Sequence, residues 1–184
     1  RLSAEQGNVL AQKYLEALLK KSPSVNKNDD DYSRNLISNL FSIVVKYEKD
    51  KPAINWELLN NFCNCFNPNE LSAEYPIYEV ERKGRKQNKE FASDLEKWYV
   101  IKTKALEKLE RWKECSELSL LALNSLKKFH DSDDIWFARR IALAKKNIGS
   151  PKDAIEELKN ILKNKNEWFI QKEIADIYFE INEK

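Results

Sequence analysis

The chain has 184 residues, of which 42% are hydrophobic and 34% are charged, and its 32 lysines and arginines nearly balance its 30 aspartates and glutamates. This length allows one domain or two compact units, and a formal net charge of +2 excludes a global electrostatic field that would attract nucleic acid or an anionic membrane. Only 3 glycines are present, and this scarcity favours an all-α fold, because tight turns and glycine-bounded strands must be few.

Residues 1–66 have the hydrophobic spacing of three helices. An amphipathic helix is predicted from about 4 to 20, and a second one follows an acidic loop and carries the apolar residues of 36–45. A third helix is predicted to begin after Asn55, whose side chain can accept a hydrogen bond from a free N–H group of the first turn. We therefore expect an N-terminal helical part of about three helices.

Residues 67–92 interrupt the helical periodicity and are predicted to be an irregular connector. Pro76 and Gly84 break any long helix in this segment. The stretch 75–80 alternates enough for a short extended segment, and an aromatic plug over a helix end is an equally good interpretation.

Five of the eight residues from 82 to 89 are basic and surround a glycine. They are Arg82, Lys83, Arg85, Lys86 and Lys89. Cations on a loop attract the phosphates of nucleic acid without regard to sequence. The favoured alternative is a solvated connector, because three glutamates flank the run at positions 79, 81 and 90.

Residues 93–184 contain one pattern three times. An aromatic pair opens each copy and an alanine follows six or seven residues later. The pairs are Trp98-Tyr99, Trp136-Phe137 and Trp168-Phe169, and the alanines are Ala105, Ala142 and Ala175. Small residues at these positions and at Ala154 would let helices approach closely. Self-similarity of this kind is typical of stacked helical hairpins.

Two local signals fix helix boundaries in this half. Ser93 and Glu96 form the sequence of a capping box at a helix start. The run Gly149-Ser150-Pro151 is predicted to stop one helix with a left-handed glycine and to begin the next with a capping hydroxyl and a first-turn proline.

The pattern resembles tetratricopeptide repeats over about residues 93–184. Ile148-Gly149-Ser150-Pro151-Lys152-Asp153-Ala154 follows the family's turn signature except for Pro151, and 109–115 follows it with Glu110 in place of glycine and Cys115 in place of alanine. The two turns are 39 residues apart, where the family uses 34. The resemblance implies antiparallel hairpins stacked as a solenoid, with two hairpins and a capping helix here and about eight helices in the whole chain.

The resemblance also implies a concave groove lined by the first helix of each hairpin. The residues expected there are mostly basic with two aromatic rings: Lys97, Lys104, Lys108, Trp136, Arg139, Lys146, Phe169 and Lys172. Such a surface suits an acidic or C-terminal peptide, with Trp136 as an anchor. The alternative is that Trp136 and Phe169 pack between hairpins as core.

The sequence contains few residues or motifs that could support catalysis. His130 is the single histidine, and no phosphate-binding loop, dinucleotide fingerprint or zinc-protease motif occurs. Cys63 and Cys65 lie two residues apart on a helix, so we expect one in the core and one at the surface rather than a shared zinc ion. Cys115 is expected to be a buried, inert thiol. We predict no enzymatic activity, no cofactor and no metal site.

Localisation and function are predicted at a coarser level. Three cysteines do not resemble a disulfide framework, no apolar run approaches the length of a membrane span, and a cytoplasmic protein without a membrane partner is expected. The first functional hypothesis is a non-catalytic scaffold that binds a protein or peptide. The alternatives are a nucleic-acid-binding helical module that uses 82–89, and a regulatory arm of a larger protein such as a bacterial defence protein.

Overall fold

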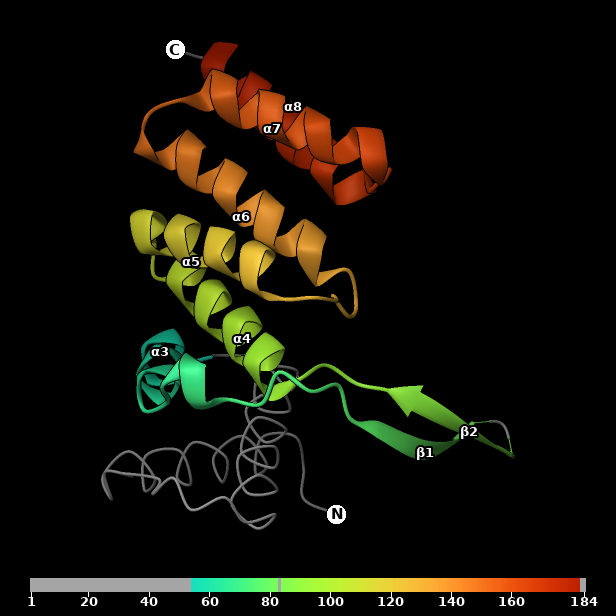
Figure 1. The fold of residues 1–184 in the computed structure, drawn as a ribbon. Coiled ribbons are helices and arrows are strands. Elements are labelled where there is room, and N and C mark those ends of the chain that lie inside the picture. Colours follow the sequence, from blue (N-terminus) through green and yellow to red (C-terminus); the bar gives the residue numbers. More distant parts are fainter. Residues whose placement is uncertain (1–53, 83, 183–184) are drawn as a thin grey trace. The chain divides into compact units, whose positions relative to one another are not determined.

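The described residues of the computed structural model are 54–82 and 84–182, so the helices expected at 4–20 and 36–45 lie outside them. The described part contains six α-helices, one short 3-10 helix and one two-stranded sheet, which confirms a mostly helical chain (Figure 1). The chain divides into two compact units between Ala105 and Leu106.

The first unit contains the predicted third helix. Helix α3 spans Trp56–Asn64. Its N-cap is Asn55, whose side-chain oxygen accepts a hydrogen bond from the Leu58 N–H at 2.9 Å, as expected. The buried side chains of α3 include Leu59 and Phe62. A single 3-10 turn, Pro68–Glu70, follows.

Helix α4 spans Asp94–Lys108 and begins immediately after the predicted capping residue, Ser93. The Glu96 N–H donates to the hydroxyl of Ser93 at 3.1 Å, which confirms this half of the capping box. Within the first unit, α4 is tied to α3 because the indole N–H of Trp98 donates to the carbonyl of Cys63 at 2.8 Å. Both partners are buried.

The segment 67–92 is not irregular throughout, and this is a correction of the prediction. Strands β1 (Ile77–Arg82) and β2 (Arg85–Glu90) form an antiparallel hairpin, in register from Ile77 opposite Glu90 to Arg82 opposite Arg85. Gly84 lies in the turn with a φ of +74°, a conformation that glycine adopts without strain. Strand β2 lacks apolar alternation, because every residue in it is polar or charged, so its pairing was not visible in the sequence.

The second unit contains four further helices: α5 (Trp112–Ser125), α6 (Asp133–Ile148), α7 (Pro151–Asn164) and α8 (Trp168–Asn182). Each of these helices packs on the next one along the chain (Figure 1).

The α6–α7 turn confirms the predicted stop and restart, with one exception. Gly149 has a φ of +129°, the N–H groups of Gly149 and Ser150 both donate to the carbonyl of Lys145, and Pro151 is the first residue of α7. The hydroxyl of Ser150 makes no capping hydrogen bond, so this part of the prediction is wrong. The proline supplies the preset φ of a first helical residue and needs no hydrogen-bond partner for its nitrogen.

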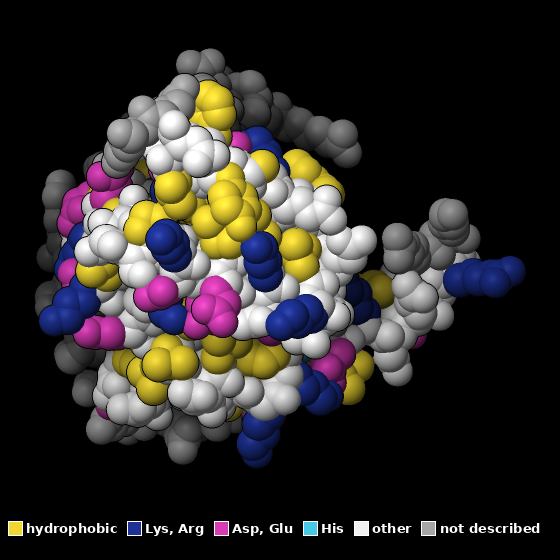
Figure 2. Space-filling model, turned by 90° about the horizontal axis from the view of Figure 1, so that it is seen from above, with side chains coloured by type: hydrophobic (Ala, Val, Ile, Leu, Met, Phe, Trp, Pro, Cys, Tyr) yellow, Lys and Arg dark blue, Asp and Glu magenta, His cyan; other side chains and the backbone are white. Residues whose placement is uncertain are grey.

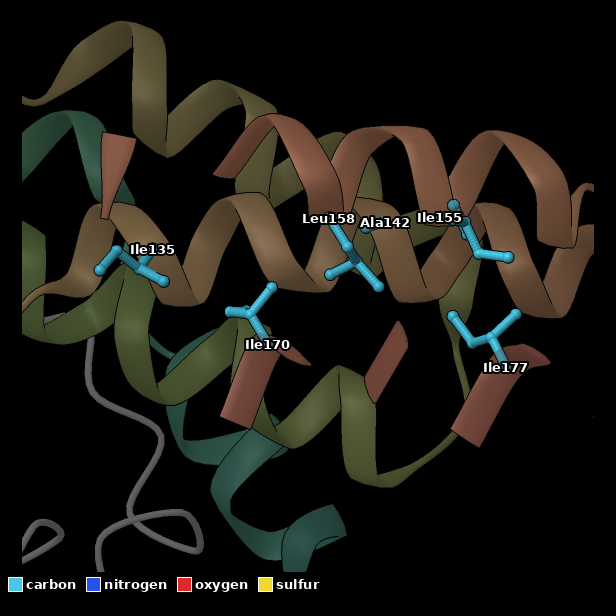
Figure 3. Packing of buried hydrophobic residues seen from close by; sticks show 7 residues of the cluster. Ile135, Ala142, Ile155, Leu158, Ile170 and Ile177 are labelled. Atoms are coloured by element: carbon cyan, nitrogen blue, oxygen red, sulfur yellow. The ribbon is translucent and has the colours of Figure 1, made fainter. Parts of the chain in front are cut away.

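The core of the second unit lies between α6, α7 and α8. Its buried residues are Ile135, Ala142, Ala154, Ile155, Leu158, Ile170 and Ile177. Figure 3 shows Ile170 and Ile177 pointing from α8 toward the labelled residues of α6 and α7. The fully buried alanines 142 and 154 allow α6 and α7 to pack closely, as expected. Ala175 is exposed, so the prediction that it packs against another helix is wrong within the described residues.

Candidate functional site

All but one of the cations predicted for the groove contact other side chains of the described residues. In the first unit, Lys97 pairs with Asp94 at 3.0 Å, and the Lys104 ammonium lies 5.9 Å from the centre of the Trp56 ring. In the second unit, Lys146 pairs with Glu180 at 2.6 Å and Lys172 pairs with Asp176 at 2.6 Å. Lys108 is exposed. An acidic ligand at Lys97, Lys146 or Lys172 would therefore compete with a carboxylate that is already bound.

Arg139 belongs to a buried network of charges. Its guanidinium donates to Glu107 at 2.8 Å and, through Nε, to Glu173 at 3.0 Å. The neighbouring Arg140 donates to the other oxygen of Glu107 at 3.0 Å. Only 4% of the Arg140 side chain and 10% of the Glu107 side chain are exposed. The network thus joins the end of α4 to α6 and α8 inside the second unit.

Burial and the neighbouring charges shift the pKa values of this network in opposite directions. Burial alone would raise the pKa of Glu107, but the hydrogen bond from Arg139 and the charges of both arginines outweigh it, so the pKa lies below its usual value. Burial lowers the pKa of Arg140 against the attraction of Glu107. The Nη1 atom of Arg140 has no hydrogen-bond partner among the described residues.

The two aromatic residues expected in the groove are stacked on each other. The rings of Trp136 and Phe169 are 4.6 Å apart and inclined by 4°, and the Arg139 guanidinium carbon lies 5.5 Å from the centre of the indole. Both rings are half-buried. The structure therefore brings Trp136, Arg139 and Phe169 together, but as a packed contact between α6 and α8 with its charges neutralised.

Sequence reasoning missed a second apolar side of α8. One side carries Ile170, Ile174, Ile177 and Ile181, which are buried or half-buried against α6 and α7. The opposite side carries Trp168, Lys172, Ala175 and Phe179 with the same spacing of i, i+4, i+7 and i+11. Trp168 is 72% exposed and Phe179 is 64% exposed. A helix that is apolar on two sides is typical of one covered on both.

The exposed side of α8 corresponds to a covered side of α6. A shift of 33 residues aligns Ala142 with Ala175 in the two helices. The same shift aligns Phe137 and Ala144 with Ile170 and Ile177, all of them fully or almost fully buried. It also aligns Ile135 with Trp168. Ile135 and Ala142 lie in the core beside α7, whereas Trp168 and Ala175 are exposed.

The exposed apolar residues of α8 contrast with the exposed positions of α7, which are polar or charged. On the surface seen from the end that carries α7 and α8, hydrophobic side chains gather near the centre, with basic and acidic side chains around them (Figure 2). This gathering departs from an ordinary polar exterior.

The residues expected to contact nucleic acid lie on the hairpin. Arg85, Lys86 and Lys89 are exposed members of β2. Lys86 pairs with Glu79 at 2.8 Å, whereas Lys89 lies 5.1 Å from the centre of the Phe91 ring. Arg82 is the last residue of β1, and Lys83 lies outside the described residues. The hairpin thus carries Arg82, Arg85, Lys86 and Lys89.

The thiols are held mostly in their neutral form. Burial raises the pKa of Cys63 to about 12 and that of Cys115 to about 11. Burial also raises the pKa of the half-exposed Cys65. The expected division into one core thiol and one surface thiol at 63 and 65 is confirmed. A thiol with a raised pKa is a poor nucleophile at neutral pH.

Within 54–82 and 84–182, no group of three or more histidine, cysteine, aspartate and glutamate residues is arranged to hold a metal ion. None of the helices in these ranges has the length and hydropathy needed to cross a membrane.

Comparison with known proteins gives no match of any kind: no family model, no curated protein and no solved structure is similar to the chain. Functional inference therefore depends on the residues and their geometry.

Proposed function

We propose that this chain is a non-catalytic protein-interaction module, and that residues 106–184 form a tetratricopeptide-like stack of hairpins. The observation that carries the proposal is the second apolar side of α8, with Trp168 72% exposed and Phe179 64% exposed. A single exposed apolar residue is ordinary, but a stripe with helical spacing is typical of a surface that another protein covers. The free cysteines are consistent with a reducing compartment.

The partner surface differs in chemistry from the cationic groove. Arg139, Lys146 and Lys172 are each paired with a carboxylate of the same chain. An acidic peptide would have to displace these carboxylates, and the exchange of one ion pair for another yields little free energy. An apolar partner has no carboxylate to displace, and its binding would bury the side chains of Trp168 and Phe179.

The partner segment that fits best is an amphipathic α-helix. Helix α7 occupies the corresponding position beside α6, where Ala154 and Leu158 join Ile135 and Ala142 in one core. On α8, the aligned residues are Trp168 and Ala175. A helix with a small residue followed four positions later by leucine would pack across Ala175, since the absence of large side chains there permits a close approach.

The test uses a synthetic peptide with the sequence of 151–164 as a probe for such a helix. We titrate it into the ¹⁵N-labelled whole chain and follow the amide resonances. The expected shifts are concentrated at Trp168, Lys172, Ala175 and Phe179, and they saturate at millimolar peptide or below. Such weak binding is expected because a free peptide of this length is only marginally helical.

Two comparisons make the experiment decisive. A peptide in which Leu158 is replaced by aspartate should cause no shifts, and the protein variant Phe179→Asp should lose them while Leu120→Asp keeps them. Leu120 is a matched control, because it is an exposed leucine of α5, at 53%. No response to the peptide, or equal responses in the two protein variants, would remove α8 as the docking surface.

A further inference from the structure

The hairpin separates its charges between its two faces. In an antiparallel pair, directly opposite residues lie on the same face and successive residues alternate between faces. One face carries all three glutamates of the hairpin: Ile77, Glu79 and Glu81 lie opposite Glu90, Asn88 and Lys86. The other face carries Tyr78 opposite Lys89, Val80 opposite Gln87, and Arg85 at the turn end. This second face has no acidic residue.

The contacts of the side chains agree with this assignment. The Lys86–Glu79 ion pair lies on the acidic face. On the other face, the Tyr78 ring lies 5.7 Å from the Phe91 ring, and the Lys89 ammonium lies over that same ring. Tyr78 is 54% exposed although it contacts Phe91. We call Tyr78, Arg85, Gln87, Lys89 and Phe91 the cationic face.

The cations of this face have no carboxylate partner among the described residues. No ion pair involves Arg85 or Lys89 among the described residues, whereas Lys86 on the opposite face has a glutamate. Arg85 and Lys89 are four residues apart on one strand, so their positions are roughly 13 Å apart at the usual rise of a strand. They can therefore contact separate phosphates of one chain, with the amide of Gln87 between them.

We propose that the cationic face of the hairpin binds single-stranded nucleic acid. Arg85 and Lys89 contact phosphates, and the exposed ring of Tyr78 stacks on a base. A single strand fits better than a duplex because an aromatic ring beside cations stacks only on bases that are unpaired. The chain's small net charge does not oppose this binding, since the attraction arises from one local face. The site is independent of α8 and of the proposed protein partner.

The test measures fluorescence anisotropy of a labelled 20-nucleotide oligothymidine with the whole chain, from 50 to 200 mM NaCl. The key comparison is Lys89→Gln with Lys86→Gln, because both remove one charge from the same strand but from opposite faces. Lys89→Gln should weaken binding severalfold and reduce the slope of log K against log salt by about 0.7, whereas Lys86→Gln should leave the slope unchanged.

A third variant examines stacking separately from charge. Tyr78→Ala should weaken binding by roughly fivefold or more while the salt slope stays that of the natural chain. These positions are exposed, so the variants should keep the helical circular dichroism and melting temperature of the natural chain. If a variant changes the circular dichroism or the melting temperature, Tyr78→Phe and Lys89→Arg are measured as well. These substitutions keep the ring and the charge, and both should retain binding.

Several outcomes would overturn the proposal. One is the absence of binding to oligothymidine and to an oligouridine of equal length at 50 mM NaCl. Another is an equal loss in the Lys86 and Lys89 variants, which would indicate unspecific attraction by the whole strand. Preference for a duplex of the same length, or equal binding of a labelled oligoglutamate, would assign the face to a different ligand.

Discussion

Glu107 neutralises two largely buried arginines of the second unit, Arg139 and Arg140. It accepts hydrogen bonds from Arg139 and Arg140 at 2.8 and 3.0 Å, and little of any of the three side chains is exposed. A buried ion pair stabilises a fold less than its contacts suggest, but the removal of one partner leaves a buried charge without compensation. Two arginines would be left in this state by the loss of Glu107, although Arg139 would keep Glu173.

We therefore predict that Glu107→Gln destabilises the chain at pH 7 by about 3 kcal/mol, measured by urea denaturation. The effect should depend on pH. Because the pKa of Glu107 is lowered in the folded state, its contribution is fully present above the unfolded value near 4.5 and is lost as the pH falls through the folded value. The difference between the natural chain and the variant should shrink in that acidic range. A constant difference from pH 7 to pH 3 would contradict the prediction.

Gly149 and Glu110 lie in turns between helices and both have a positive φ, although only one of them is a glycine. Gly149 has a φ of +129°, and no atom lies within 4 Å of where a Cβ would stand. Glu110 occupies the position where the repeat family has glycine, and it also has a positive φ, of 57°. The α4–α5 turn thus keeps the conformation that glycine favours while using a residue that adopts it at a cost.

Two substitutions at these turns should change stability in opposite directions. Glu110→Gly should raise the free energy of unfolding by up to about 1 kcal/mol, because it relieves a left-handed conformation. Gly149→Ala should lower it by at least about 1 kcal/mol through backbone strain alone, since there is space for the methyl group. Thermal unfolding followed by circular dichroism measures both. A loss of stability in Glu110→Gly would mean that the side chain contributes more than the strain costs.

Helix α8 shows what periodicity can and cannot indicate at this scale. Ile174, Ile177 and Ile181 recur with helical spacing and lie on the side that packs against α6 and α7. The same spacing at Trp168, Ala175 and Phe179 is equally visible in the sequence. Periodicity reports that a side is apolar but not which element covers it, and here α7 covers one side while the other is open.

The whole molecule consists of two compact units, and each contains one fully buried cysteine. Cys63 belongs to the first unit and Cys115 to the second. Their pKa values, raised by burial to about 12 and about 11, keep both thiols protonated at neutral pH until the surrounding structure opens. Each thiol is therefore a built-in reporter for the unfolding of its own unit.

Brief alkylation at increasing urea, read by peptide mass spectrometry, should separate the two units. Leu158→Ala removes a fully buried side chain of α7 and should cost about 2–5 kcal/mol. We expect it to lower the urea midpoint for labelling of Cys115 and to leave that of Cys63 unchanged. Equal shifts of both midpoints would show that the units unfold as one. Cys65 should react early in every sample, because it is half-exposed.

The local elements whose signals lie close together in the chain can be predicted from the residues alone. The cap at Asn55, the start of α4 after Ser93 and the proline that begins α7 depend on a few neighbouring residues and are confirmed. The helical character of the described residues follows from short-range spacing in the same way.

Which side chains meet, and which charges lack a partner, depends on contacts between residues that are far apart in the sequence. Arg139 is 32 residues from Glu107 and 34 from Glu173, so the sequence showed a cation but not the carboxylates that neutralise it. The partner of strand β1 is an all-polar segment that pairs through its backbone, and this pairing alone separates Lys86 from Lys89. Long-range contacts of this kind depend on how elements pack, and single-sequence periodicity contains no information about that packing.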